Sequence, residues 1–215
     1  MLKSFRIKDN HPRLVLIGNS NVGKSTIAKY FLHNKKLATG AIGKQAGSTV
    51  ALKLYRDPAL PFDIVDLPGF GAMTRTSKDR KDKIHTEIVQ YVERDKSNIF
   101  LIMVIISGLR VLDELEKWYY QDETTIPLTF EFISWIGGQL GLPCVMVVNK
   151  IDRLKHKEIE QITHELNKIL EDFQCDMNTQ TPNGLMKIFT VSAKNGVNMQ
   201  ELKRFVEDRF NLTNQ

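Results

Sequence analysis

The residues with the clearest chemical signature lie near the N-terminus, in the stretch Gly18-Asn19-Ser20-Asn21-Val22-Gly23-Lys24-Ser25. Two glycines with four residues between them, followed by Lys and Ser, form the phosphate-loop pattern. Glycines let the backbone close around a phosphate group, and successive N–H groups at a helix N-terminus attract the anion. Lys24 can then reach the β- and γ-phosphates of a nucleotide, and the Ser25 hydroxyl can coordinate Mg²⁺. The alternative is an ordinary glycine-rich turn, which the expected strand before the stretch and helix after it disfavour.

A second stretch, Asn149-Lys150-Ile151-Asp152, indicates which base the nucleotide carries. The Asp152 carboxylate can accept two hydrogen bonds, from N1–H and from the exocyclic amino group of guanine, and adenine offers no such pair of donors. The aliphatic stem of Lys150 can lie over the base, and Asn149 can tie this loop to the phosphate loop. The four residues alone would be compatible with a surface turn. Their place at the carboxyl end of an expected strand, where such sheets bind ligands, favours guanine recognition.

Two shorter motifs complete a guanine-nucleotide site. Asp66-Leu67-Pro68-Gly69 follows an expected strand, so Asp66 can hold a Mg²⁺-bound water and the Gly69 amide can sense the γ-phosphate. Ser192-Ala193-Lys194 follows another, where the Ala193 amide can bind guanine O6. Each motif alone could be a structural turn, but four in this order at strand ends are unlikely to coincide by chance. The expected nucleotide contacts are Gly18, Asn19, Ser20, Asn21, Val22, Gly23, Lys24, Ser25, Thr26, Asp66, Leu67, Pro68, Gly69, Asn149, Lys150, Asp152, Ser192, Ala193 and Lys194.

Strands and helices in alternation must position these motifs. Apolar runs at residues 14–17, 99–106, 144–148 and 188–191 predict buried strands. Residues 49–56 alternate between two faces and a short link leads to 62–65, which predicts an antiparallel hairpin. A helix is expected from Gly23 to about His33, and helical spacing recurs at 159–173 and 199–210. Strands separated by helices predict a doubly wound α/β domain with helices on both faces of the sheet.

Composition limits the class of protein further. The chain has 215 residues, of which 42% are hydrophobic and 26% charged, as in globular rather than disordered proteins. Its longest apolar run, at 99–106, is far shorter than the ~20 residues of a membrane helix, and we find no signal peptide or lipidation motif. Cys144 and Cys175 form no metal or redox pattern, which suits a reducing compartment. We therefore expect one cytoplasmic domain over 1–215, monomeric and without a membrane partner.

The order of these motifs resembles the translation-factor-related (TRAFAC-class) P-loop GTPases. Finer details resemble the EngB (YihA-type) GTP-binding proteins, namely SNVGKS, Lys35-Lys36-Leu37, Gly47-Ser48-Thr49 and DLPGFG, and the stretch 118–132 is most similar to archaeal members. The resemblance extends from about Pro12 to Phe210. It implies a Ras-like fold with a six-stranded mixed sheet, and hydrolysis of GTP to GDP and phosphate with Mg²⁺. It also implies a role in large-ribosomal-subunit assembly and, by family usage, in cell division and septation.

The resemblance also suggests the metal ligands and catalytic groups. The expected metal ligands are Ser25, Asp66 and Thr49. Ser48, and after it Thr39, are alternatives to Thr49, because alanine stands at Ala46 where the family usually has proline before this segment. Lys24, Thr49 and Gly69 are the expected catalytic residues.

Hydrolysis is expected to be slow. Phe70 stands where Ras-like proteins carry a water-orienting glutamine. Asn21 occupies the position that helps to hold K⁺ in related potassium-activated GTPases, so K⁺ or a partner could supply the missing assistance.

Two questions remain open at this level. The net charge of +5 and the basic residues at 35–36, 44 and 78–83 fit a ribosomal particle or rRNA as partner, and equally fit solvated faces. A signalling GTPase and a non-hydrolysing GTP-dependent binding module are the rival functions.

Overall fold

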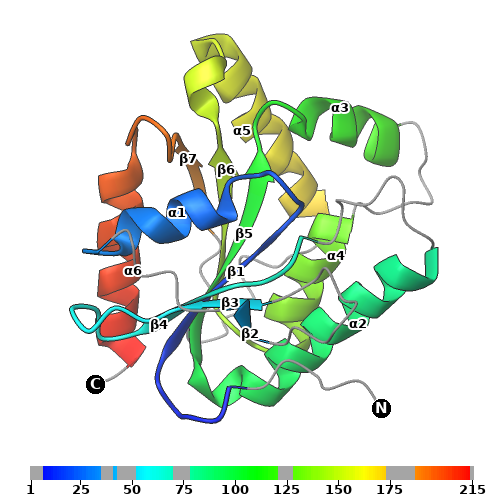
Figure 1. Ribbon diagram of the computed structural model, residues 1–215. Helices are drawn as coiled ribbons and strands as arrows, with labels where there is room; N and C mark the ends of the chain where they lie inside the picture. Colours follow the sequence, from blue (N-terminus) through cyan, green and yellow to red (C-terminus); the bar gives the residue numbers. More distant parts are fainter. Residues whose placement is uncertain are drawn as a thin grey trace.

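The computed structural model describes residues 7–34, 41–42, 52–69, 78–120, 128–172 and 187–213. These form a sheet of seven strands in the order β2-β3-β4-β1-β5-β6-β7 (Figure 1). The strands are β1 (Arg13–Gly18), β2 (Ala41–Ile42), β3 (Leu52–Tyr55), β4 (Asp63–Asp66), β5 (Ile99–Ser107), β6 (Cys144–Asn149) and β7 (Ile188–Val191). Pairing is parallel from β4 through β1, β5 and β6 to β7, and antiparallel for β2–β3 and β3–β4. The mixed sheet, its six predicted strands and the hairpin are confirmed, and the two-residue β2 adds an edge.

Helices cover both faces of the sheet (Figure 1). They are α1 (Lys24–Phe31), α2 (Lys78–Asp95), α3 (Val111–Leu115), α4 (Leu128–Ser134), α5 (His156–Asp172) and α6 (Met199–Thr213), with short η1 (Lys96–Asn98), η2 (Glu116–Tyr120), η3 (Trp135–Gln139) and η4 (Ile151–Arg153). Apolar residues of α1 and α6 pack in one buried cluster, and those of α2, α3, α4 and α5 pack in the other. The doubly wound architecture is therefore confirmed.

Strand β1 shows why the central strands are continuous apolar runs. Leu14 and Leu16 enter the cluster with α1 and α6, whereas Val15 and Ile17 enter the cluster on the opposite face. Because side chains alternate across a sheet, a strand covered on both faces needs an apolar residue at every position. Burial of each such leucine, valine or isoleucine side chain stabilises the fold by about 1.5–3 kcal/mol. The end of β1, at which the phosphate loop begins, is therefore held firmly in the core.

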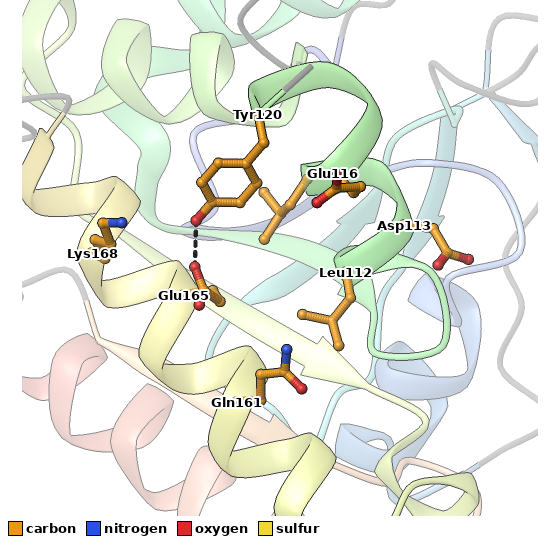
Figure 2. A pocket seen from close by; sticks show the side chains of 8 residues that line it. Leu112, Asp113, Glu116, Tyr120, Gln161, Glu165 and Lys168 are labelled. Carbon is orange, nitrogen blue, oxygen red and sulfur yellow. Dashed lines mark hydrogen bonds between the residues drawn. The ribbon is translucent and has the colours of Figure 1, made fainter. Parts of the chain in front are cut away.

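A groove of about 480 Å³ lies between the α3–η2 segment and α5 (Figure 2). The Tyr120 hydroxyl donates a hydrogen bond to Glu165, and the Lys168 ammonium lies 5.8 Å from the centre of the Tyr120 ring. These contacts attach η2 to α5. None of the predicted site residues lines this groove, so we do not assign the nucleotide to it.

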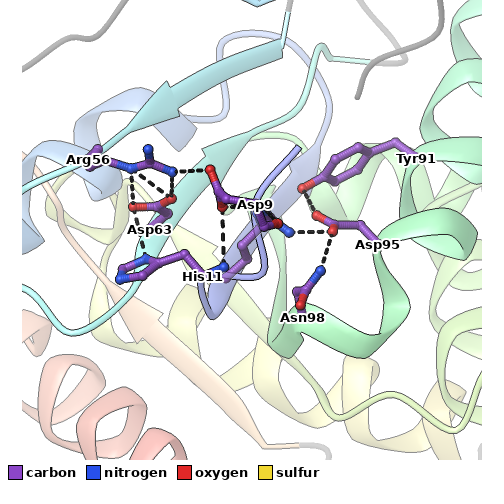
Figure 3. A network of polar contacts seen from close by, with 8 residues as sticks. Asp9, His11, Arg56, Asp63, Tyr91, Asp95 and Asn98 are labelled. Atoms are coloured by element: carbon purple, nitrogen blue, oxygen red, sulfur yellow. Dashed lines mark hydrogen bonds and ion pairs between the residues drawn. The ribbon is translucent and has the colours of Figure 1, made fainter. Parts of the chain in front are cut away.

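A polar network ties together the opposite, amino end of the sheet (Figure 3). The Arg13 guanidinium is fully buried and pairs with Asp95 at the end of α2, while the Tyr91 hydroxyl donates to the same carboxylate at 2.6 Å. Arg13 also contacts Asp9 at 2.8 Å. Nothing in the sequence pattern predicted that Arg13 and Asp95 would be buried together.

The same network continues to β4. Arg56 donates to both carboxylate oxygens of Asp63 at 3.1 Å and to Asp9 at 2.8 Å, and His11 lies 3.2 Å from Asp63. These contacts hold the starts of β1 and β4 in place.

Within the described part of the chain, no helix combines the length and the apolar composition that crossing a membrane requires.

Candidate functional site

The topology brings four motifs to one edge of the sheet. The phosphate loop follows β1, Asp66 ends β4, Asn149 ends β6 and Ser192 follows β7. Because these strands are parallel to one another, their carboxyl ends lie at the same edge, with β5 in the middle. This is the edge at which open α/β sheets bind their ligands.

The phosphate loop wraps around the Lys24 side chain. The Lys24 ammonium donates to the carbonyl oxygens of Gly18 and Asn19, both at 2.9 Å. The side chain is only 7% exposed, and this burial lowers the pKa of Lys24 to about 8, with the nearby Lys53 charge lowering it further and Asp66 opposing the change. A lysine held at the first turn of α1 adds a positive charge to a helix N-terminus, which suits a phosphate ligand.

Gly23 is required where the loop enters the helix. It caps α1 with a φ of 103°, and a Cβ at this position would lie 2.3 Å from Nδ2 of Asn149. Any larger residue would therefore strain the backbone and displace Asn149.

Ser25 and Asp66 form a corner beside Lys24. The Ser25 hydroxyl donates to Asp66 at 2.5 Å, and burial raises the pKa of the Asp66 carboxyl, which the Ser25 hydrogen bond and the two lysine charges oppose. Lys53 and Tyr55, on β3, complete the corner. The Lys53 ammonium lies 3.5 Å from Ser25 Oγ, and the Tyr55 side chain interacts with Ser25, its pKa being raised mainly by burial.

The donor set of this corner fits Mg²⁺. A hydroxyl and a carboxylate side by side are hard oxygen ligands, and Mg²⁺ in nucleotide sites is held by one or two protein oxygens together with phosphates and water. The described residues contain no group of three or more His, Cys, Asp and Glu side chains that could hold a metal alone. The other predicted ligand, Thr49, lies outside the described residues, as do its alternatives Ser48 and Thr39.

The loop after β4 lies against the phosphate loop. A Cβ on Gly69 would be 2.5 Å from the Ser20 nitrogen and 2.4 Å from its hydroxyl, so only glycine permits this approach. The Leu67 amide donates to the Leu16 carbonyl at 3.1 Å, which extends the β1–β4 pairing to the loop. Phe70 lies outside the described residues.

Asn149 joins the phosphate loop to the loop after β7. It is 3% exposed, donates to the Val22 carbonyl at 2.9 Å and accepts a hydrogen bond from the Ala193 amide at 3.0 Å. The structure therefore has the link to the phosphate loop that the sequence predicted. The Ala193 amide, which the sequence assigns to guanine O6, is here directed at Asn149.

The base-recognition loop is braced in two further places. Lys150 has a φ of 71° and its ammonium donates to the Asn21 carbonyl, so its stem spans the space between the two loops. Asp152 accepts a hydrogen bond from the buried Ser192 hydroxyl at 2.7 Å. One hydrogen bond uses a single lone pair of the carboxylate, which has about four, so Asp152 retains acceptor capacity for guanine.

The described site residues thus gather at one edge, with differing exposure. Val22 and Leu67 are buried in the core and can offer a ligand only their backbone, whereas Thr26 and Lys194 are exposed. Sequence reasoning missed Lys53 and Tyr55. Their alternation with Leu52 and Leu54 did place them on a common face, but not beside Ser25.

The fold and the arrangement of this edge define a P-loop GTPase. A family model described as 50S ribosome-binding GTPase matches residues 13–150, and one described as the elongation factor Tu GTP-binding domain matches residues 128–211. The chain is 34% identical over 173 residues to a probable GTP-binding protein EngB of Methanococcus maripaludis, covering 79% of this chain and 69% of the relative. It is 32% identical over 191 residues to a probable EngB of Pyrococcus abyssi, covering 88% and 82%. The chain therefore belongs to the EngB family of GTP-binding proteins, and it is a GTPase of archaeal type.

Solved structures show the same fold. A crystal structure of a probable GTP-binding protein engB superposes with a TM-score of 0.67 at 24% identity and covers 93% of this chain and 98% of its own. Era in complex with MgGDPNP and nucleotides of 16S ribosomal RNA superposes with a TM-score of 0.52 at 20% identity, covering 91% of this chain and 55% of Era.

Proposed function

We propose that this GTPase is a Mg²⁺-dependent nucleotide switch that acts on the ribosome, in assembly of the large subunit. The observation that carries the nucleotide part is the corner of Lys24, Ser25 and Asp66 at the end of β1 and β4, with Asn149 bracing the base loop above it. The ribosomal part is supported by the family model, which is described as a 50S ribosome-binding GTPase. The proposal includes a single cytoplasmic, monomeric domain and a link to cell division and septation.

The main site residues have distinct roles in this proposal. Lys24 contacts the β- and γ-phosphates, and the amides of residues 18–26 surround them. Ser25 and Thr49 would hold Mg²⁺, and Asp66 would hold a metal-bound water; the bound ion would supply positive charge that offsets the charge of the phosphates. Asp152 accepts from guanine N1–H and N2–H. The Ala193 amide turns from Asn149 to guanine O6.

Hydrolysis in this proposal relies on charge stabilisation rather than on a general base. Lys24 and the Gly69 amide face the γ-phosphate, while Phe70 has no polar group to orient water. We infer that hydrolysis is stimulated either by K⁺, whose positive charge Asn21 would help to hold beside the phosphates, or by a ribosomal partner that supplies the missing water-positioning group. Single-turnover hydrolysis in Na⁺ and in K⁺, with and without ribosomal subunits, tests this. Fast hydrolysis by the isolated protein in Na⁺ would contradict it.

Co-sedimentation with purified ribosomal subunits tests the ribosomal part. We expect the protein to pellet with the large subunit when loaded with a non-hydrolysable GTP analogue, and less with GDP. Asp152→Asn is the matched control, because it should pellet only with the corresponding xanthosine analogue. Absence of binding to either subunit in every nucleotide state would overturn the ribosomal role and leave the GTPase assignment intact.

A further inference from the structure

Lys53 lies at the proposed magnesium corner although no motif includes it. It faces Asp66 directly in the antiparallel β3–β4 register. Its ammonium donates to Ser25 Oγ at 3.5 Å, and the same Ser25 hydroxyl donates to Asp66 at 2.5 Å. The corner therefore already holds a cation from the chain itself.

The Ser25 hydroxyl keeps a second lone pair for a metal ion, but the charge of a metal ion bound there conflicts with the charge of Lys53. A hydroxyl has one proton and two lone pairs, and here the proton points to Asp66 while a lone pair faces Lys53. Mg²⁺ binds oxygen at about 2.1 Å and demands near-octahedral geometry. A dication at that distance from Ser25 would repel the Lys53 ammonium, which is exposed and sits on a flexible stem.

We propose that Lys53 is a stand-in cation for Mg²⁺. When the metal is absent, its ammonium balances Asp66 and supports the nucleotide phosphates beside Lys24, and metal binding displaces it. This inference rests on the proposed magnesium site at Ser25 and Asp66. Its consequence is that Lys53 supports nucleotide binding without Mg²⁺ and competes with Mg²⁺ for the corner.

The affinity for GDP, measured in excess Mg²⁺ and in EDTA, tests this inference. In EDTA, Lys53→Met should weaken binding of a fluorescent GDP about tenfold, the scale of one partly solvated charge-assisted hydrogen bond. In excess Mg²⁺ its affinity should stay within about twofold of wild type. The Mg²⁺ concentration for half-maximal tightening should fall, because the competitor is gone. Lys53→Arg should retain wild-type binding in EDTA.

Lys29→Met is the matched control, since Lys29 is an exposed lysine near the end of α1 and outside the corner. It should leave both affinities unchanged, and an equal loss in this variant would assign the effect to overall charge and overturn the inference. A loss in Lys53→Met that is equal in Mg²⁺ and in EDTA would make Lys53 a permanent phosphate ligand and also overturn it. If wild type itself failed to bind GDP in Mg²⁺, the proposed function would fail instead.

Discussion

Asn149 should stabilise the protein even without nucleotide, because a single side chain joins two loops that belong to different strands. Its amide group donates to Val22 and its oxygen accepts from Ala193, at 2.9 and 3.0 Å. Asn149→Ala removes both of these hydrogen bonds at once. It leaves a carbonyl on Val22 and an N–H on Ala193 without the hydrogen bonds that they have in the wild type.

The magnitude follows from the burial of these groups. Val22 is 4% exposed and Ala193 is 9% exposed, so little water reaches either residue. An unsatisfied buried donor or acceptor costs about 1–3 kcal/mol. Taking both groups, and allowing water to enter from the open edge of the sheet, we expect the free energy of unfolding to fall by about 3 kcal/mol. For a domain of this size that corresponds to a fall in Tm of about 6–12 °C.

Urea unfolding of the nucleotide-free protein measures this change directly. Titration with GDP then shows whether the affinity of the site for nucleotide changes as well. Asn98→Ala is the control, because Asn98 lies near the amino end of the sheet and donates to Asp95 at 2.9 Å. We expect that variant to lose about 1 kcal/mol and to keep its GDP affinity. An Asn149→Ala protein as stable as wild type would refute the reasoning, whatever its GDP affinity.

Four further substitutions test other parts of the molecule. Asp152→Asn should weaken GTP binding by about 10⁴-fold and favour xanthosine nucleotides, because the site's acceptor becomes a donor; fluorescent-nucleotide titration checks this. Thr49→Ala should spare GDP affinity and weaken binding of a GTP analogue in the same assay, since we expect its hydroxyl to ligate Mg²⁺ only in the GTP state. In nucleotide-free protein in EDTA, the lowered pKa of Lys24, about 8 against 10.5, means that the unfolded chain binds more protons between these values. As pH rises from about 8 to 10.5, this group should therefore increase the free energy of unfolding of the wild type by about 3 kcal/mol. Urea unfolding at several pH values in that range should show no such increase for Lys24→Met. Asp63→Asn should lower the free energy of unfolding by about 1–3 kcal/mol, because it removes the charge of a buried carboxylate that accepts hydrogen bonds from the half-exposed Arg56. It should leave GDP affinity unchanged, because this network lies at the far end of the sheet.

The central strands could be predicted because their burial leaves a direct mark on the sequence. Strands β1, β5 and β6 are covered on both faces, so every residue in them is buried and the apolar runs are continuous. The two-residue β2 left no such mark, since so short a segment has no periodicity and depends on its partner β3.

Helix α2 was missed for a different reason. Its start, residues 78–83, is a run of mixed charge that we interpreted only as a solvated or RNA-facing surface. The core side chains that follow, Ile84, Ile88, Tyr91 and Val92, recur at helical spacing and are all buried. The signal was present, but the charged first turns obscured it.

The buried network at the amino end of the sheet could not be predicted. Arg13 and Asp95 are 82 positions apart, and a charged residue is normally expected at the surface. Their burial depends on tertiary pairing of the start of β1 with the end of α2, which no local pattern encodes.

In the candidate site, too, sequence motifs identify the residues but do not predict how these residues are arranged. Motifs identified its residues because each follows a strand, but the neighbours of Ser25 depend on the register of the β3–β4 hairpin. That register pairs Lys53 with Asp66 and Tyr55 with Ile64. A shift of one residue would turn Lys53 to the other face and bring Leu52 or Leu54 beside the hydroxyl. The surroundings of the Ser25 hydroxyl therefore depend on the register of this strand pair. Sequence alternation limits that register to two choices, and only the folded sheet decides between them.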